Sequence, residues 1–412
     1  MSGMVVVGGS YAGVQSAVSA RESGYQDRIT IISDEAHLPY QRPPLSKDLL
    51  LGKSREDSLW LRTPDYFRNN SIELLLGKSV VEIDRQAKQL TFSDGDNQPY
   101  DVLVLACGAQ IRRLQVSGSD KADVRYLRTL DDSVRLRGQL ESASSVAIVG
   151  GGFVGLEVAA AARVMGKEVT VIEAAPRLLQ RAVSQTMSDF VLELHRGHGT
   201  DIMVSETAER IDGRDGDLRI ITCNSGRAIN CDLIVAGIGS SPNDQLAKAS
   251  GLATANGIVV DELCRTVDDA IFAAGDCSNH PSDFARCRLR LESVQNALDQ
   301  GRTVGSTIAG RPLPYSAVPR FWSDQFDCKL QMTGLLMDHD SQAVRGDVEQ
   351  RKFSIFMYQG PRLTGIESVN RPSDQLIGRK LLASGRTPLP HQVIDLSFDL
   401  RQIEAPGPSQ NN

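Results

Sequence analysis

The same pattern of hydrophobic and polar positions occurs twice in the chain. Residues Met4 to Glu35 and Ser145 to Arg177 each contain a short β-branched run, a glycine-rich turn, an Ala/Val-rich helical stretch and a second strand-like run ending in an acid. This order predicts the strand, helix and strand of a mononucleotide-binding unit of about 30 residues. Two such units suggest an internal duplication and predict an α/β fold with two Rossmann-like dinucleotide-binding domains.

Further strand-like segments follow the two units. They are Val102 to Ala109, Leu233 to Asn243 and Ile271 to Cys277, and each closes on small residues. From Arg320 onward, apolar and polar residues alternate, as is typical of an antiparallel sheet, and a helix-like stretch follows near Ser373 to Leu382. The chain is therefore predicted to end in a third, α+β domain.

The glycine turn of the second unit has the features of a dinucleotide-binding motif. Gly150, Gly152 and Gly155 follow a strand and open a helix, and Glu173 comes about 20 residues later. These glycines allow a tight turn, close approach of a pyrophosphate and close packing of helix on strand, while Glu173 can accept hydrogen bonds from a ribose. The alternative is a tight turn without a ligand.

The first unit departs from this motif at one position. It reads Gly8-Gly9-Ser10-Tyr11-Ala12-Gly13, with Ser10 in place of the middle glycine. Asp34 and Glu35 still provide a ribose acceptor at the end of the second strand.

Three further positions have a functional and a structural interpretation. The proline-rich loop Pro39 to Leu50 presents Arg42 and Lys47, either to a ligand or simply to solvent. Glu157 lies in an otherwise apolar helix, as a first-turn carboxylate or as a partly buried acid facing a cofactor. Trp322 is either functional or a core tryptophan.

Composition excludes several classes of function. The 412 residues include 45 Lys and Arg against 51 Asp and Glu, a net charge of −6, which disfavours a nucleic-acid partner. No apolar run reaches the roughly 20 residues of a membrane span, and no signal peptide is recognisable, so we expect a cytoplasmic protein that does not bind membranes. The seven cysteines show no CxxC or CxxxxC pair, which argues against a redox dithiol and against a cysteine-ligated metal.

Nine segments in order along the chain carry a resemblance to a known family. They read GGSYAG, PYQRPPLSKDLL, LVLACGAQ, GGGFVGLEVAAAA, VTVIEAAPRLLQRAVS, DLIVAGIGSSPN, IFAAGDC, ESVQNALDQGR and FWSDQ. Together they resemble the FAD-dependent, NADH-utilising ferredoxin reductases of bacterial monooxygenase and dioxygenase systems. The resemblance implies a glutathione-reductase-like fold, with an FAD-binding domain of residues 1–110 and 240–319, an NAD-binding domain of residues 111–239 and a C-terminal domain of residues 320–412.

The resemblance also implies roles for individual residues. The residues implied to contact FAD are Gly8, Ala12, Gly13, Asp34, Arg42, Lys47, Val81, Arg128, Asp276 and Val294. The residues implied to contact NADH are Gly150, Gly152, Gly155 and Glu173. Lys47 and Glu157 are implied to form an ion pair beside the flavin, with Glu157 near the nicotinamide and Trp322 beside the ring; no metal site is implied. Cys107, Arg320 and Ser10 depart from the pattern of the family.

The function implied is electron transfer from NADH through FAD to a two-iron two-sulfur ferredoxin, in a monomer or a weak homodimer. The alternatives are a rubredoxin reductase or NADH oxidase of the same fold, and a non-catalytic flavoprotein that senses NADH. Docking of an acidic ferredoxin would need a local basic patch, for which Arg286, Arg288, Arg290, Arg302 and Arg320 are the candidates. If Arg286 to Arg290 is a strand, its three arginines share one face; the alternative is a solvated strand edge.

Overall fold

The computed structural model describes residues 2–120, 122–213, 218–336 and 339–403. Within these ranges the chain forms two compact units, and each is discontinuous in sequence. The first unit consists of residues 1–41, 56–110 and 240–319, and the second of residues 42–55, 111–239 and 320–412.

The first unit is built on a five-stranded parallel sheet in the order β18-β7-β1-β2-β3. Its strands are β1 (Met4–Val7), β2 (Ile29–Ser33), β3 (Ile72–Leu76), β7 (Val102–Leu105) and β18 (Ile271–Ala273). Strands β1 and β2 flank helix α1 (Tyr11–Glu22), so the predicted mononucleotide-binding unit is confirmed. The strands consist mainly of Val, Ile and Leu because a parallel sheet is buried on both faces.

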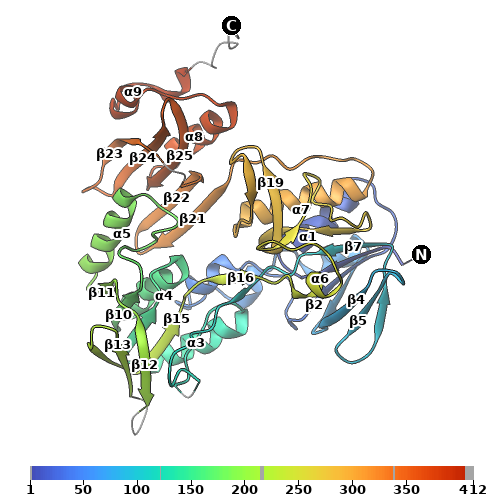
Figure 1. The fold of residues 1–412 in the computed structure, drawn as a ribbon, viewed down its shortest axis with the longest axis horizontal. Helices are drawn as coiled ribbons and strands as arrows, with labels where there is room; N and C mark the ends of the chain where they lie inside the picture. Colours follow the sequence, from blue (N-terminus) through green and yellow to red (C-terminus); the bar gives the residue numbers. More distant parts are fainter. Residues whose placement is uncertain (1, 121, 214–217, 337–338, 404–412) are drawn as a thin grey trace. The chain divides into compact units, whose positions relative to one another are not determined.

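Helix α7 (Val294–Ile308) packs against α1, although the two helices are far apart in sequence (Figure 1). Small residues make this close contact possible. A Cβ atom on Gly305 would lie 2.5 Å from the carbonyl oxygen of Ser16, and one on Gly301 would lie 2.9 Å from that of Ala12. The contact explains how residues after 240 complete a unit that begins at the N-terminus.

Short elements complete the first unit. They are α2 (Pro64–Asn69), β4 (Val80–Asp84), β5 (Gln89–Phe92), β6 (Asn97–Pro99), β8 (Ala109–Ile111), β16 (Ser240–Pro242), α6 (Gln245–Ala249), β17 (Ile258–Val259), β19 (Ser278–Ser282) and β20 (Cys287–Leu289), with the 3-10 helices η2 (Glu56–Leu59) and η3 (Gly275–Cys277). Strands β4, β5 and β6 form an antiparallel meander.

The second unit contains a four-stranded parallel sheet in the order β11-β10-β9-β15. Its elements are α3 (Leu130–Ser142), β9 (Ser145–Val149), α4 (Phe153–Val164), β10 (Glu168–Glu173), α5 (Gln185–Gly197), β11 (Asp201–Val204) and β15 (Leu233–Ala236), with an antiparallel meander of β12 (Ala208–Gly213), β13 (Arg219–Cys223) and β14 (Ala228–Cys231). Strands β9 and β10 flank α4, which confirms the second predicted mononucleotide-binding unit.

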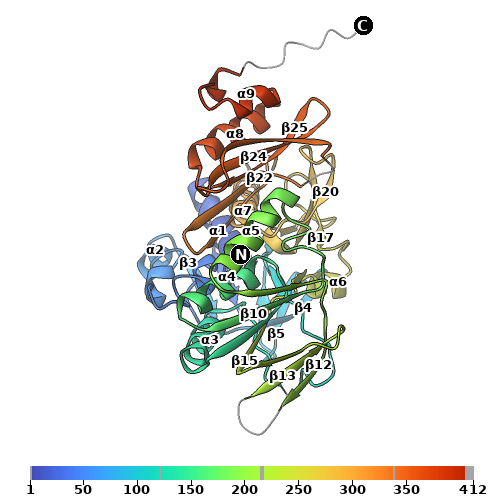
Figure 2. The same ribbon diagram turned by 90° about the vertical axis from the view of Figure 1, so that its left-hand side faces the viewer.

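Residues from Arg320 onward form a five-stranded antiparallel sheet in the order β21-β22-β25-β24-β23. Its strands are β21 (Arg320–Gln325), β22 (Cys328–Gly334), β23 (Ser341–Asp347), β24 (Lys352–Gln359) and β25 (Arg362–Val369), and they are followed by α8 (Pro372–Ser384), α9 (Pro390–Ile394) and η4 (Leu400–Gln402). Figure 2 shows α8 and α9 beside the sheet, where α8 contacts β22 and β25 and α9 contacts β23. The predicted antiparallel sheet and the helix after it are confirmed.

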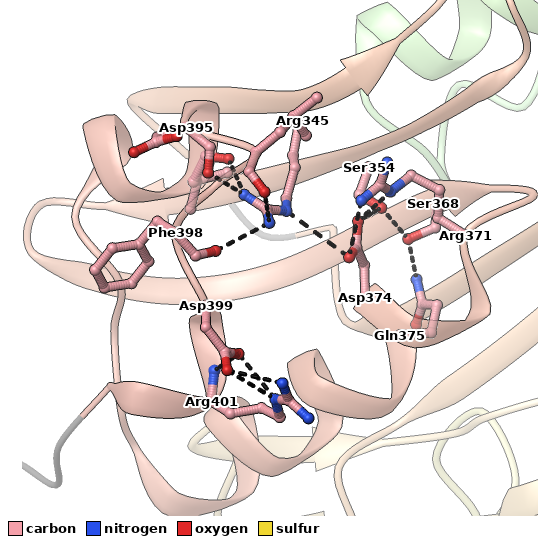
Figure 3. Close-up of polar contacts among 12 residues, drawn as sticks. Arg345, Ser354, Ser368, Arg371, Asp374, Gln375, Asp395, Phe398, Asp399 and Arg401 are labelled. Atoms are coloured by element: carbon pink, nitrogen blue, oxygen red, sulfur yellow. Dashed lines mark hydrogen bonds and ion pairs between the residues drawn. The ribbon is translucent and has the colours of Figure 1, made fainter.

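The side chain of one arginine binds the segment that follows α8 to this sheet. The guanidinium of Arg345, on β23, donates hydrogen bonds to the carbonyl oxygens of Val393, Asp395, Leu396 and Phe398, at 2.6 to 3.3 Å (Figure 3). Its Nε lies 3.8 Å from the carboxylate of the buried Asp374. The segment after α8 is therefore held through its backbone carbonyl groups.

Within the described ranges, no helix is both long enough and apolar enough to cross a membrane. The same part of the chain contains no cluster of three or more His, Cys, Asp or Glu side chains arranged to bind a metal ion. All seven cysteines are free thiols.

Candidate functional site

The three glycines of the second turn have different local geometries. Gly150 adopts φ +112°, which favours glycine, and a Cβ atom on Gly155 would lie 2.2 Å from the carbonyl oxygen of Gly150. A Cβ atom on Gly152 would meet only the carbonyl oxygen of Gly237, at 3.9 Å. Gly150 and Gly155 are thus required by the turn and its packing, whereas the space beside Gly152 is open to a ligand.

Glu173 is fixed beside this turn. Its two carboxylate oxygens accept hydrogen bonds from the backbone N–H groups of Gly151 and Ala175, both at 2.6 Å. Gly152 is the N-cap of α4 and has no side chain, so no side-chain oxygen competes for the first-turn N–H groups. The arrangement suits a dinucleotide, with pyrophosphate at the helix N-terminus and a ribose hydroxyl at Glu173.

Two alanine substitutions in this turn should affect different properties, one the stability of the protein and the other the binding of NADH. We expect Gly155→Ala to lower the free energy of unfolding by about 2 kcal/mol, because its Cβ would overlap the Gly150 carbonyl. Gly152→Ala should change that free energy by less than about 1 kcal/mol but raise the KM for NADH. Thermal unfolding measures the change in stability, and steady-state kinetics at varied NADH measure the KM. A Gly152→Ala protein with an unchanged KM would contradict pyrophosphate binding beside Gly152.

The first turn repeats this geometry with one difference. Gly8 has φ +122°, and a Cβ on Gly13 would lie 2.0 Å from the Gly8 carbonyl oxygen. Ser10 is the N-cap of α1, yet its side chain makes no capping hydrogen bond, unlike Ser184 and Ser293 at the starts of α5 and α7. The serine at the middle glycine position is therefore compatible with the turn.

The carboxylates at the end of β2 have different surroundings. The side chain of Glu35 accepts a hydrogen bond from the Tyr40 hydroxyl, whereas Asp34 is exposed. Ala12, the other residue of this turn implied to contact FAD, is buried in the first turn of α1. Asp34 therefore remains the candidate ribose acceptor of the first unit.

The other candidate FAD residues of the first unit lie at the ends and irregularities of its elements. Val81 is 55% exposed and lies at a β-bulge between β4 and β5. Asp276 is in η3, and Val294 is the first residue of α7. Sequence reasoning missed Gln300, whose buried Oε1 accepts hydrogen bonds from the Gly275 N–H at 2.7 Å and the Ser278 hydroxyl at 2.8 Å, and so fixes the loop that carries Asp276.

The two cationic side chains of the proline-rich loop, Arg42 and Lys47, are not simply solvated. Arg42 donates a hydrogen bond to the carbonyl oxygen of Arg128 at 2.8 Å, so these two candidates are brought together within the second unit. Lys47, which follows the 3-10 helix η1 (Pro43–Ser46), is 16% exposed. The interpretation of this loop as merely exposed is therefore wrong.

Lys47 and Glu157 form the predicted ion pair. The Lys47 Nζ lies 2.8 Å from the Glu157 Oε1, and the glutamate is 6% exposed. The hydroxyl groups of Ser46 and Ser323 also donate to this carboxylate, the latter at 2.6 Å. Glu157 lies beyond the first turn of α4, so the interpretation as a first-turn carboxylate is wrong; it is a buried acid with three donors.

Trp322 lies in β21 next to Ser323. Since side chains alternate along a strand, Ser323 faces inward to Glu157 while Trp322 faces the other side and is 36% exposed. The alternative of a core tryptophan is therefore wrong. Whether Trp322 lies beside a flavin stays a prediction.

The proposed arginine face requires a correction. Strand β20 contains only Cys287–Leu289, and Arg288 uses its guanidinium on the carbonyl oxygens of Val260 and Asn279, both at 2.5 Å. Arg290 is 11% exposed and pairs with Glu292 at 2.6 Å. Arg302 pairs with Asp299. Arg288 is thus held by carbonyl groups of other segments, whereas Arg290 and Arg302 pair with acids of their own segments.

Cys107 is a partly buried thiol with a raised pKa. Burial, with smaller contributions from Cys277 and Asp34, raises the pKa of Cys107 well above its ordinary value. A thiol in this state is a poor nucleophile. The departure at Cys107 therefore adds no reactive thiolate to the first unit.

The chain matches two family models. The Pyridine nucleotide-disulphide oxidoreductase model matches residues 2–301, and the Reductase C-terminal model matches residues 320–404. These two matches cover both dinucleotide-binding units and the antiparallel C-terminal domain, and they define an α/β flavoprotein fold of the glutathione-reductase type.

Individual relatives are similar over nearly the full length. Rhodocoxin reductase of Rhodococcus erythropolis is 44% identical, over 97% of this chain and 93% of that protein. The ferredoxin reductase for the CYP199A2 system from Rhodopseudomonas palustris has a TM-score of 0.94 at 43% identity, over 97% of this chain and 99% of that one. The reductase in a covalent putidaredoxin reductase-putidaredoxin complex has a TM-score of 0.93 at 38% identity, over 97% of each chain.

The chain therefore belongs to the pyridine nucleotide-disulphide oxidoreductase family, and within it to the ferredoxin reductases that carry the Reductase C-terminal domain. It is a flavoprotein oxidoreductase, with FAD as cofactor and NADH as substrate. The open space beside Gly152 and the fixed carboxylate of Glu173 fit a nicotinamide dinucleotide.

Proposed function

We propose that this protein passes electrons from NADH to a two-iron two-sulfur ferredoxin that supplies a bacterial monooxygenase or dioxygenase. The observation that carries the proposal is the buried Lys47–Glu157 pair, an acid and a base fixed 2.8 Å apart inside an apolar helix environment. Ion pairs of this kind are costly to bury and are common at reaction centres.

The second mononucleotide-binding unit binds and orients NADH in this proposal. The N-terminus of α4 and Gly152 receive the pyrophosphate, and Glu173 accepts from the adenosine ribose. Bound FAD supplies the conversion between a two-electron hydride donor and a one-electron acceptor. Glu157 and Lys47, fixed by their ion pair, would contact the nicotinamide and the flavin edge and would orient them for hydride transfer.

Electrons leave without a disulfide in this proposal. No cysteine precedes Cys107, so none lies near Lys47 in sequence. Desolvation raises the pKa of the partly buried Cys107 and of the buried Cys277. Direct transfer to a protein partner is therefore favoured over thiol chemistry. Trp322 is the exposed aromatic residue next to the Glu157 site along β21 and is proposed to lie beside the flavin ring.

The choice of acceptor is supported by the relatives. One solved relative is in a covalent complex with putidaredoxin, and another is the ferredoxin reductase for the CYP199A2 system. Rubredoxin reductases of Pseudomonas putida are 38% identical over 90% of this chain, so rubredoxin is the second candidate acceptor. The acceptor must therefore be decided by direct comparison.

We expect the purified protein to reduce a two-iron two-sulfur ferredoxin at least tenfold faster than rubredoxin at equal concentrations with NADH. The measurement is NADH oxidation coupled to cytochrome c, with ferricyanide as the small acceptor that reports total turnover. Fast ferricyanide turnover with a preference for rubredoxin would overturn the acceptor. Slow ferricyanide turnover with a long-lived NADH charge-transfer band would instead identify a sensor.

A further inference from the structure

A chain of buried side chains extends from Glu157 across the second unit. The Ser323 hydroxyl lies 2.6 Å from Glu157 Oε1, the Gln325 Nε2 lies 3.1 Å from Ser323 Oγ, and the His195 Nε2 lies 2.9 Å from Gln325 Oε1. Ser323 and Gln325 are on the inward face of β21, and His195 is on α5. All four side chains are at most 6% exposed.

The contact at Glu157 determines which group donates and which accepts in every hydrogen bond of this series. An ionised carboxylate only accepts, so the single hydroxyl proton of Ser323 must be donated to Glu157. Ser323 must then accept from Gln325, which orients the Gln325 NH2 group toward Ser323 and its oxygen toward His195. His195 must therefore donate, which requires its neutral form to carry the proton on Nε2.

The surroundings of His195 support this assignment. Its Nδ1 is buried and has no hydrogen-bond partner in the described part of the chain, as suits an unprotonated nitrogen better than an N–H group. Burial lowers the pKa of His195 to about 4, so the ring is neutral at pH 7. The Phe326 ring packs against it edge to face, with centroids 5.1 Å apart. The His195 ring, whose Nε2–H group is the first donor of the hydrogen-bond series, is thus held in one orientation.

We propose that His195, Gln325 and Ser323 are positioning residues that orient the Glu157 carboxylate toward Lys47. Each donor in the series polarises the next, so the hydrogen bond that reaches Glu157 is stronger than that of an isolated serine. Together with Ser46 on the other oxygen, the series fixes both oxygens of the acid that holds Lys47. The inference rests on the proposed role of Glu157 in hydride transfer.

Stopped-flow reduction of the flavin by NADH tests the role of Ser323. We expect Ser323→Ala to slow reduction about tenfold, because it removes a hydrogen bond to a charged group, and Ser323→Thr to restore most of the rate. In a Glu157→Gln background, Ser323→Ala should have no further effect, since Ser323 acts through that carboxylate. The matched control is Ser188→Ala, which removes a buried hydroxyl of α5 that donates to the Leu178 carbonyl and has no link to Glu157.

The outcomes separate this inference from the proposed function. An equal loss from Ser323→Ala in both backgrounds would mean a purely structural role and overturn the inference. A normal rate in Ser323→Ala, with Glu157→Gln slow, would overturn the inference and leave the proposed function intact. If Glu157→Gln is as fast as the wild type, the proposed role of Glu157 fails and the inference fails with it.

A second measurement does not depend on turnover. Nitrogen-15 NMR of histidine-labelled, flavin-loaded protein should show His195 with its proton on Nε2 from pH 6 to 8, and Gln325→Leu should change its imidazole shifts. The Nδ1–H form in the wild type would overturn the direction of the chain. This result decides that direction even if NADH fails to reduce the flavin.

Discussion

Replacing Lys47 with alanine should slow flavin reduction by NADH about 100-fold. The change removes one partner of a buried pair and leaves Glu157 desolvated; among the described residues, the hydroxyl groups of Ser46 and Ser323 are then its remaining side-chain donors. Breaking a pair of this kind costs on the order of 3 kcal/mol, which corresponds to that factor in rate. Stopped-flow absorbance at the flavin band measures the rate, and the ratio of flavin to protein absorbance measures cofactor retention.

The matched control is Lys53→Ala, which removes the same charge from an exposed position three residues after the proline-rich loop. It should reduce at the wild-type rate. Lys47→Arg should keep part of the activity, because it preserves the charge but not the position of the donor. Wild-type reduction by Lys47→Ala, with flavin fully retained, would exclude any role of this ion pair in hydride transfer.

Replacing Glu173 should remove most of the discrimination between the two nicotinamide nucleotides. We expect wild-type kcat/KM to favour NADH over NADPH by about 100-fold, roughly 2.7 kcal/mol, because the Glu173 carboxylate would repel a 2′-phosphate. The next arginine along the chain, Arg177, donates to the carbonyl oxygens of Gln180 and Val183 in its own loop and so does not offset this repulsion. Steady-state kinetics with both nucleotides measure the ratio.

Two variants separate the charge of Glu173 from its structural role. Glu173→Gln keeps an oxygen that can accept from Gly151 or Ala175 while removing the repulsion, so NADPH should improve with little loss of stability. Glu168→Ala removes a carboxylate about 17 Å away along the same strand and should leave the ratio unchanged. Comparable wild-type kcat/KM for NADH and NADPH would refute the assignment.

Local patterns in the sequence were sufficient to predict the two mononucleotide-binding units. The β-branched runs, the glycine spacing and the terminal acid are all within about 30 residues, and these are the features that β1 to β2 and β9 to β10 realise. The C-terminal sheet was equally predictable, because alternation of apolar and polar residues is a direct consequence of strand geometry. Several elements between these, including the meander of β12 to β14, were not predicted.

Contacts between distant segments could not be predicted from these patterns. Ser323 is 166 positions from Glu157, and nothing in the residues around either one signals the hydrogen bond between them. The predicted arginine face was wrong for the same reason. Alternation predicts on which side of a strand a side chain lies, but it does not reveal that the carbonyl groups of Val260 and Asn279 accept hydrogen bonds from Arg288. Only the ion pair of Lys47 and Glu157 was anticipated, and that expectation came from family resemblance.

The four carbonyl groups that bind Arg345 make this part of the attachment of the C-terminal segment independent of its exposed side chains. Main-chain oxygens are the same in every residue, so exposed side chains such as Ile394 and Leu396 can be exchanged without altering the anchor. This stretch is therefore suitable for substitutions of exposed side chains, or for attaching a linker to a redox partner, without altering the sheet on which it packs. Such a redesign has to retain Arg345 together with the buried side chains of Val393 and Leu400.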